Sequence, residues 1–263
     1  MTKLGRLGMA GLQEVGATLL FGWQSLRLFL RYGVKISQIV DQMYAVGVRS
    51  VPTTVVSGLF VGAIMAIQIN LQLRDFGAQG FLGGLSTSTT IRNVGPVLIA
   101  FILSGKVGAY TSAELGTMRV TDQVDAIRCL GTDPVAYLIL PRLFAVTISS
   151  FLLLIVGLLM TILGGMMISA FHLGINIILY TTNIPNFVSG WSIAIGVLKS
   201  FVFGSLIGVI SCYRGYYTTG GAMGVGKTVR QTAVASLVCI IIADFTLSCL
   251  TTFLIDWIGV GTL

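Results

Sequence analysis

The chain has 263 residues, of which 55% are hydrophobic and only 10% are charged. Soluble domains carry roughly 25% charged residues, so this composition excludes a soluble globular protein and predicts several membrane spans. The net charge of +7 does not indicate nucleic-acid binding, because the basic residues are scattered over short loops, where membrane topology alone would place them. The 33 glycines are spread through the apolar runs, which suits close helix packing in lipid.

The cysteines and the one histidine show no spacing typical of a metal site or a disulfide framework. They are Cys129, Cys212, Cys239, Cys249 and His172. We therefore expect no metal and no cofactor bound by this chain. Near the N-terminus, Glu14 and Arg27 interrupt the apolar residues and no small-residue cleavage site follows, so we expect no cleaved signal peptide.

Residues 9–32 predict an amphipathic helix that lies in the membrane surface rather than across it. Its apolar residues recur at steps of three and four: Leu12, Val15, Leu19, Trp23, Leu26 and Leu30. Arg27 and Arg31 lie off this face. A soluble core helix is the alternative, but the chain offers no soluble domain to bury it. A weaker amphipathic stretch follows through Ile36, Ile39, Val40 and Met43.

Five apolar stretches predict five transmembrane helices, at 50–73, about 88–108, 143–171, about 187–210 and about 231–255. The 24 residues of the first would reach about 36 Å, enough to cross a bilayer with some tilt. The third has 29 uncharged residues, so we expect it to tilt, protrude or break near Gly164-Gly165. Residues 75–90 and 172–186 are expected to form loops. The second span contains Pro96 and should place Lys106 near the interface.

Basic residues indicate the orientation of these spans. With a cytoplasmic N-terminus, thirteen fall on the inner side and two, Arg74 and Arg92, on the outer side. The inner set is Lys3, Arg6, Arg27, Arg31, Lys35, Arg49, Lys106, Arg119, Arg128, Arg142, Arg214, Lys227 and Arg230. An odd number of spans then puts the C-terminus on the periplasmic side.

The most charged segment, residues 105–134, lies between the second and third spans. Thr111-Ser112-Ala113-Glu114 has the spacing of a capping box, so we expect a helix from about 112 to about 131. Its end is marked by Gly131 and the following Asp133-Pro134. The pattern predicts a short amphipathic helix on the cytoplasmic side; an ordinary solvated loop helix fits the periodicity as well.

Residues 221–228 satisfy the pattern of a nucleotide-binding P-loop, G-x-x-x-x-G-K-T. A P-loop needs a preceding strand and a surrounding nucleotide-binding domain, whereas predicted spans flank this segment on both sides. We interpret it as a Gly-rich cytoplasmic turn that lets the fourth and fifth spans pack closely.

Lys199 and Asp244 lie well inside the fourth and fifth spans. An isolated charge at the bilayer centre costs about 2.5 to 3.5 kcal/mol on insertion scales. Opposite charges on neighbouring antiparallel helices would relieve much of this cost by pairing, so we predict a contact between Lys199 and Asp244. Separate snorkelling, or separate contact with water, is the alternative.

The segment GKVGAYTSAELGTMRVTDQVDAIRCLGTDP at 105–134 closely resembles the signature of the MlaE/YrbE permease family. Residues 56–62, Gly95-Pro96, Lys199-Ser200, the stretch at 220–231 and Asp244-Phe245 continue the resemblance in family order. It implies an all-α integral membrane protein with about five transmembrane helices, an interfacial helix before them and a cytoplasmic coupling helix after the second span. A single permease domain would cover 1–263, with cytoplasmic and interfacial helices in 1–49 and the transmembrane region in 50–263.

The resemblance further implies the permease subunit of an ABC transporter in the bacterial inner membrane, which moves phospholipid or a related lipid and has no catalytic residues of its own. Its expected partners are an ATPase subunit that binds the ATP, an MCE-domain lipid-binding protein, a possible small accessory subunit on the ATPase, and a second copy in a homodimer. The ATPase contact would use Glu114, Arg119, Asp122, Gln123 and Asp125. Ile64, Ile67 and Gln68 are candidates for lining a lipid cavity between protomers.

One position departs from the family pattern. Asn93 stands where the proteobacterial sequences carry an acidic residue before Gly-Pro. Together with Lys199 and Asp244, Asn93 would belong to the family's intramembrane polar cluster, where it can form hydrogen bonds but cannot balance charge.

Other classes of function predict different features. An ion-coupled secondary transporter would use Lys199 and Asp244 as a proton relay and would need no ATPase. A passive membrane scaffold would tolerate loss of the charged helix. An intramembrane enzyme would need a Ser/His or Asp/Asp pair at catalytic spacing, which the spans lack.

Overall fold

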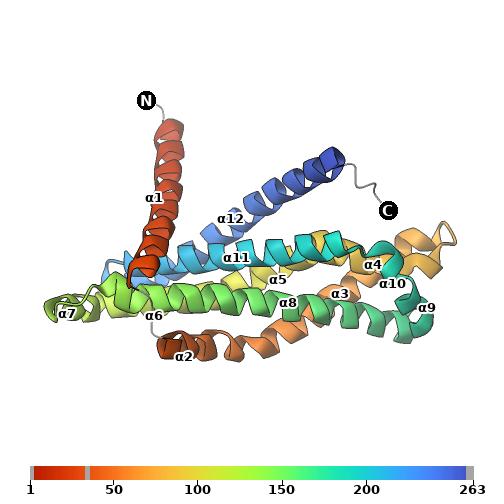
Figure 1. The fold of residues 1–263 in the computed structure, drawn as a ribbon, viewed down its shortest axis with the longest axis horizontal. Coiled ribbons are helices and arrows are strands. Elements are labelled where there is room, and N and C mark those ends of the chain that lie inside the picture. The colour runs from red at the N-terminus through yellow and green to blue at the C-terminus, as the bar shows by residue number, and fades with distance from the viewer. Residues whose placement is uncertain (1–2, 33–35, 259–263) are drawn as a thin grey trace.

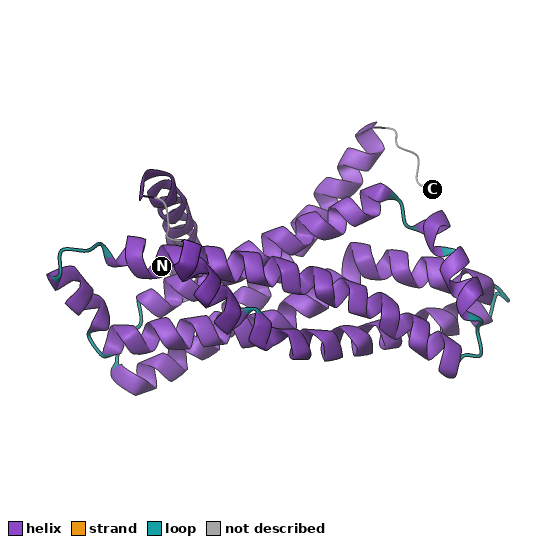
Figure 2. Ribbon diagram, turned by 60° about the horizontal axis from the view of Figure 1, so that its bottom comes forward, coloured by secondary structure: helices purple, strands orange, loops and turns teal. Residues whose placement is uncertain are grey.

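The computed structural model describes residues 3–32 and 36–258, and every secondary-structure element in these two ranges is helical (Figure 2). Five helical stretches of the described chain are long and apolar enough to cross a membrane. The expected all-α membrane protein with five spans is therefore confirmed. Lys35 and the last five residues lie outside the described ranges, as do the side chains of Leu12, Leu30 and Arg31 from the predicted amphipathic face.

The helices follow one another in a simple order. Before the spans come α1 (Lys3–Tyr32), α2 (Ile36–Val46) and the short η1 (Val48–Ser50). The first two spans are α3 (Val51–Arg74) and the run Gln79–Val120, which consists of η2 (Gln79–Phe81), α4 (Leu82–Thr89), η3 (Thr90–Val94), α5 (Gly95–Leu103), η4 (Ser104–Gly108) and α6 (Ala109–Val120). After them come α7 (Gln123–Cys129), η5 (Val135–Ile139), α8 (Leu140–Phe171), α9 (Ile177–Thr182), α10 (Ile184–Phe187), α11 (Gly190–Tyr216) and α12 (Gly221–Ile258).

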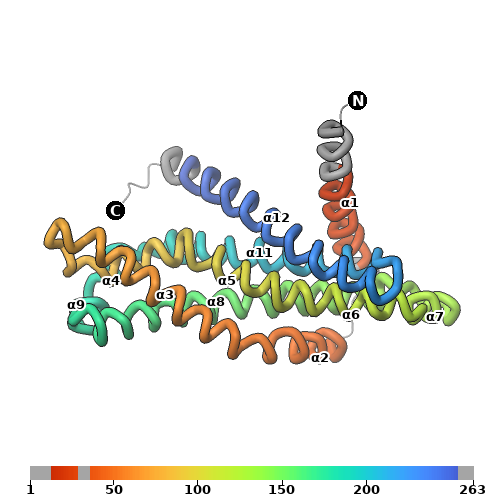
Figure 3. Tube along the Cα trace, turned by 180° about the vertical axis from the view of Figure 1, so that it is seen from behind, coloured from red at the N-terminus to blue at the C-terminus, as the bar shows by residue number. Residues whose placement is uncertain are grey.

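The spans form an elongated bundle with two distinct ends (Figures 1 and 3). One end carries α2, α7 and the turn from α11 to α12, and the other carries α4, α9 and α10. Helix α1 runs across the direction of the bundle, as a helix in the membrane surface would. The second half of α12 diverges from its neighbours, and the apolar window of this helix is only 11% buried, against 50% in α11.

Glycines bring α3 and α8 into close contact along their lengths. A Cβ atom at Gly62 would fall on the backbone carbonyl of Thr161, and one at Gly164 would fall on that of Leu59. Lipid does not drive helices together as water does, so packing at such short range supplies much of their association. The spread of glycines through the apolar runs therefore has the structural role that the sequence predicts.

The segment expected to form a loop at 75–90 is instead largely helical, and this prediction was wrong. Residues 79–90 belong to the second span, with Leu82 and Thr87 buried. The small residues that suggested a loop allow close packing: a Cβ at Gly83 would meet the carbonyl of Tyr180, and one at Gly84 would meet the ring of Phe187. The second expected loop, 172–186, also contains two short helices, α9 and α10.

Three other boundaries differ from expectation. No helix begins near Ser112, because α6 continues the second span through this residue, which is buried. Helix α8 continues without a break through Gly164-Gly165 to Phe171. The P-loop-like segment 221–228 forms the first turns of α12 rather than a turn of its own.

We predict that Gly62→Ala lowers stability by about 1–3 kcal/mol, the usual cost of forcing extra atoms into a packed interior. The matched control is Gly226→Ala, because a Cβ at that helical position meets nothing within 4 Å. Thermal unfolding of both variants in detergent, followed by loss of the monodisperse peak in size-exclusion chromatography, makes the comparison. Equal stability of the two variants would contradict the close α3–α8 contact.

Candidate functional site

The end of the bundle that carries α7 exposes a polar apex. Helix α6 ends at Val120, and Asp122 then adopts a left-handed backbone conformation with φ of 58°. This conformation separates α6 from α7, which starts at Gln123. Asp122 is the only non-glycine residue with positive φ among those described, and Asp and Asn tolerate this region better than other side chains. The expected single helix over 112–131 is therefore two helices with a turn at Asp122.

Ion pairs brace this apex from within. Arg119 at the end of α6 lies 2.8 Å from the Asp125 carboxylate on α7, and Arg128 approaches the same carboxylate at 3.5 Å. Arg128 also donates a hydrogen bond of 2.9 Å to the hydroxyl of Tyr216 at the end of α11. The apex is thus tied both to the second span and to the fourth. Of the candidate docking residues, Asp122 and Gln123 are left exposed.

Glu114, another docking candidate, lies away from this turn, on α6. Its carboxylate is 2.7 Å from the guanidinium of Arg142, which is 5% exposed. Arg142 also contacts the sulfur of Met118 at 3.2 Å. The pair joins α6 to α8 inside the bundle, where an unpaired arginine would be costly. The geometry gives Glu114 the role of balancing the Arg142 charge.

A second polar site lies among the spans, around Lys199. The Nζ atom of Lys199 is 2.7 Å from an Asp244 carboxylate oxygen, and this residue is only 1% exposed. The ammonium group also donates to the Ser248 hydroxyl and to the backbone carbonyl of Arg92, both at 2.9 Å. Lys199 therefore forms two hydrogen bonds and one ion pair inside the bundle. The predicted contact between Lys199 and Asp244 is confirmed.

Pro96 explains why the Arg92 carbonyl is available to Lys199. In an α-helix the N–H of residue 96 would donate to the carbonyl of residue 92, but proline has no N–H. The chain adopts a π-helical turn, η3, immediately before α5. The side chain of Asn93 is exposed, so the second span contributes to this polar cluster through its backbone rather than through Asn93. The i to i−4 relation between Pro96 and Arg92 is the sequence signal that would have revealed this contact.

The predicted lipid-lining residues lie together on the open side of α3. Ile64, Ile67 and Gln68 are exposed, whereas Gly62 and Ala66 are buried, with Gly62 against α8. None of the three exposed residues lines the large groove between α1, α11 and α12, which has a volume of about 1130 Å³. They form part of an apolar face that this single chain leaves uncovered.

Together these features define a multi-pass helical membrane protein with a braced polar apex and two ion pairs, Arg142–Glu114 and Lys199–Asp244, that join its spans. The family model described as Permease MlaE matches residues 39–250. The chain belongs to this family, and the resemblance of its charged segment is confirmed.

Curated relatives cover most of the chain. A probable ABC transporter permease protein of Rickettsia felis is 34% identical over 89% of this chain and 90% of its own length. A probable ABC transporter permease protein of Synechocystis is 37% identical over 80% of both chains. The protein TRIGALACTOSYLDIACYLGLYCEROL 1, chloroplastic, of Arabidopsis thaliana is 35% identical over 80% of this chain and 60% of its own length.

We predict that the double variant, Lys199→Met with Asp244→Asn, loses less stability than the sum of the losses in the two single variants. Lys199→Met leaves a carboxylate without its cation, and Asp244→Asn leaves a buried ammonium without its anion; breaking a buried pair this way costs about 3–5 kcal/mol. A double-mutant cycle on thermal unfolding in detergent measures the coupling.

The neutral double variant tests the pair better than exchange of the two residues. An exchanged carboxylate at position 199 would face the Arg92 carbonyl, and two acceptors repel. We therefore expect the exchanged variant Lys199→Asp with Asp244→Lys to recover only part of the loss. Additive single effects would show that the two charges do not depend on each other.

Proposed function

We propose that this chain is the transmembrane subunit of an ABC transporter for phospholipid or a related lipid, driven by ATP hydrolysis in a separate subunit. The main support is the braced apex, which presents Asp122 and Gln123 at one end of the bundle. Family membership and the names of the Rickettsia and Synechocystis relatives support the ABC assignment. The Arabidopsis relative bears the name of a galactolipid, which supports a lipid as the transported molecule.

The apex is suited to transmit force. Helix α6 is the last part of a helical run of 42 residues that begins at Gln79. Displacement of α7 by an ATPase would therefore act on the whole second span and, through Arg128 and Tyr216, on α11. The permease itself supplies no catalytic group in this proposal, and ATP is bound by its partner.

The orientation follows from the basic residues. Arg119, Arg128 and Arg214 lie at the same end as α7, whereas Arg74 lies at the end of α3. We assign the α7 end to the cytoplasm of a bacterial cell, with the N-terminus inside and the C-terminus on the periplasmic side of the inner membrane. The exposed apolar residues on α3 and the diverging half of α12 favour a homodimer that encloses lipid between its protomers. An MCE-domain protein would exchange this lipid, and a small accessory protein would sit on the ATPase.

The geometry of Lys199 argues against the ion-coupled alternative. A proton relay needs a group that water can reach and that can give up its proton. Lys199 is 1% exposed, and its ammonium is held by hydrogen bonds to the Arg92 carbonyl and the Ser248 hydroxyl and by the ion pair with Asp244. We assign the Lys199–Asp244 pair to holding the fifth span, not to proton transfer.

Affinity capture of the full chain from native membranes in mild detergent, with mass spectrometry of the co-purified proteins, tests the proposal. We expect wild type to retain an ABC ATPase, and Asp122→Asn together with Gln123→Ala to lose it. Asparagine preserves the left-handed turn while it removes the charge. Asp75→Asn, the same change at an exposed position near the opposite end, is the matched control and should retain the ATPase.

A further variant separates docking from folding. Glu114→Gln should lower thermal stability, because Arg142 loses its carboxylate, but the folded fraction should still bind the ATPase. Recovery of the chain without any ATPase from wild-type membranes would contradict the proposal. Loss of the ATPase from the Asp75→Asn control would show that the ATPase contact is not specific to the apex.

A further inference from the structure

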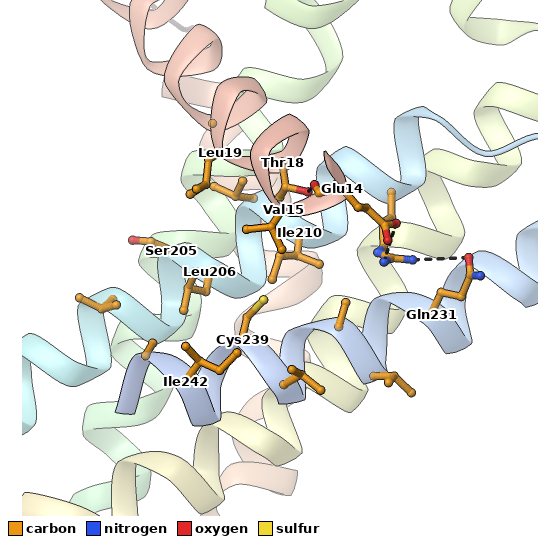
Figure 4. A pocket seen from close by; sticks show the side chains of 18 of the residues that line it. Glu14, Val15, Thr18, Leu19, Ser205, Leu206, Ile210, Gln231, Cys239 and Ile242 are labelled. Atoms are coloured by element: carbon orange, nitrogen blue, oxygen red, sulfur yellow. Dashed lines mark hydrogen bonds and ion pairs between the residues drawn. The ribbon is translucent and has the colours of Figure 1, made fainter. Parts of the chain in front are cut away.

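The groove between α1, α11 and α12 has the shape of a site for an amphiphile. Its volume of about 1130 Å³ lies at or above the upper end of ordinary small-ligand pockets, roughly 300–1,000 Å³. Each of the three helices contributes a polar residue at one end of the groove and apolar residues beyond it. Figure 4 shows Glu14 and Gln231 at one end, and Leu206 and Ile242 toward the other.

The apolar part of the groove follows helical spacing on all three helices. Helix α1 contributes Val15, Leu19 and Trp23, α11 contributes Val202, Leu206 and Val209, and α12 contributes Val234, Val238 and Ile242. On α1 these residues belong to the predicted amphipathic face, and all three remain exposed, with Leu19 at 63%. The bundle therefore leaves the apolar side of α1 uncovered along this groove.

The polar end of the groove is basic. Arg214, Lys227 and Arg230 line it, with Glu14 as the one acidic residue. Glu14 is already engaged, because its carboxylate lies 2.7 Å from Arg214. Lys227 and Arg230 are exposed and form no ion pair or hydrogen bond with another residue of the described chain. Two cations thus stand without anions at the mouth of an apolar groove.

We propose that this groove binds an anionic phospholipid of the cytoplasmic leaflet, with its phosphate between Lys227 and Arg230 and its acyl chains along Val209, Val234 and Val238. Basic pockets between transmembrane helices on the cytoplasmic side recognise anionic headgroups in this way. This assignment of leaflet rests on the orientation proposed above. The site differs from the cavity between protomers proposed for the transported lipid, because Ile64, Ile67 and Gln68 do not line it.

Charge complementarity favours a lipid over a second copy of the chain. A second copy that inserted its α11–α12 region here would bring the same basic residues against Arg214, Lys227 and Arg230. Like charges placed together in this way cost free energy, whereas a phosphate removes the imbalance. A bound lipid would also join α1 to α12, two helices that otherwise face each other across the groove.

Native mass spectrometry of the purified full chain tests this inference directly. The probes are dioleoylphosphatidylglycerol and its zwitterionic analogue dioleoylphosphatidylcholine, titrated separately into delipidated protein in mild detergent. We expect preferential binding of phosphatidylglycerol to wild type. With Lys227→Gln and Arg230→Gln combined, binding should weaken roughly thirtyfold, since each surface cation contributes about a factor of five.

Control variants separate loss of the proposed site from a general effect of changed charge or added bulk. Arg49→Gln combined with Arg74→Gln removes the same total charge at exposed positions outside the groove and should leave binding unchanged. Val238→Trp fills the apolar part of the groove and should weaken binding of phosphatidylglycerol without loss of charge. Leu159→Trp, at an exposed position on α8, is its matched control.

Each other outcome would overturn the proposal. Equal binding of both lipids, or unchanged phosphatidylglycerol binding in the Lys227/Arg230 variant, would show that the basic end recognises no anionic headgroup. If Val238→Trp changes the mass of the oligomer but leaves lipid binding intact, the groove binds a second copy of the chain instead of a lipid. The measurement uses the chain alone in detergent, so failure to capture an ATPase would not affect it.

Discussion

The ammonium group of Lys199 imposes the strictest constraint on this structure. A charge buried at this depth must find acceptors within the protein, because lipid offers none. Lys199 finds them on two other spans: the Arg92 carbonyl on the second, and Asp244 and Ser248 on the fifth. One side chain thereby fixes the relative positions of three spans. This matters most for α12, whose apolar window is only 11% buried by the rest of the chain.

Other charged residues of the bundle are also paired with opposite charges, at a lower cost in free energy. The buried Arg142 is paired with Glu114, and this pair joins α6 to α8. At the apex, where water is accessible, Arg119, Asp125 and Arg128 form a looser network. Exposed pairs of this kind contribute little stability, about 0–1 kcal/mol. In the proposed function they hold α7 in one orientation, and the exposed Asp122 and Gln123 contact the ATPase.

The sequence predicted those parts of the fold that depend on one strong physical limit. Bilayer thickness and the cost of buried charge were enough to predict five spans and the contact between Lys199 and Asp244. The fold class and the family were also readable, because the charged segment at 105–134 is long and specific. The turn at Asp122 was not predicted, because a single helix was expected from about 112 to about 131. Thr111 and Ser112 have the spacing of a helix start but lie buried inside a continuing helix.

Features that depend on packing between distant segments could not be read in this way. Residues 79–90 are polar enough for a loop, yet Gly83 and Gly84 make them helical by allowing close contact with Tyr180 and Phe187. Three helices, α1, α11 and α12, form the groove, and only α1 has an amphipathic face that the sequence pattern predicted. Lys227 belonged to a false P-loop pattern in the sequence, and the helical geometry of α12 places it at the rim of the groove instead.

The energy source of lipid movement is the most direct test of the proposed ATP-driven transport. The chain and its co-purified ATPase would be reconstituted in proteoliposomes with a fluorescent phospholipid, and transfer would be measured with ATP, with a non-hydrolysable analogue, and with an imposed proton gradient. We predict transfer that requires ATP hydrolysis and persists when an ionophore collapses the gradient. Transfer that proceeds without ATP and stops with the ionophore would contradict it, and would assign Lys199 and Asp244 to proton coupling.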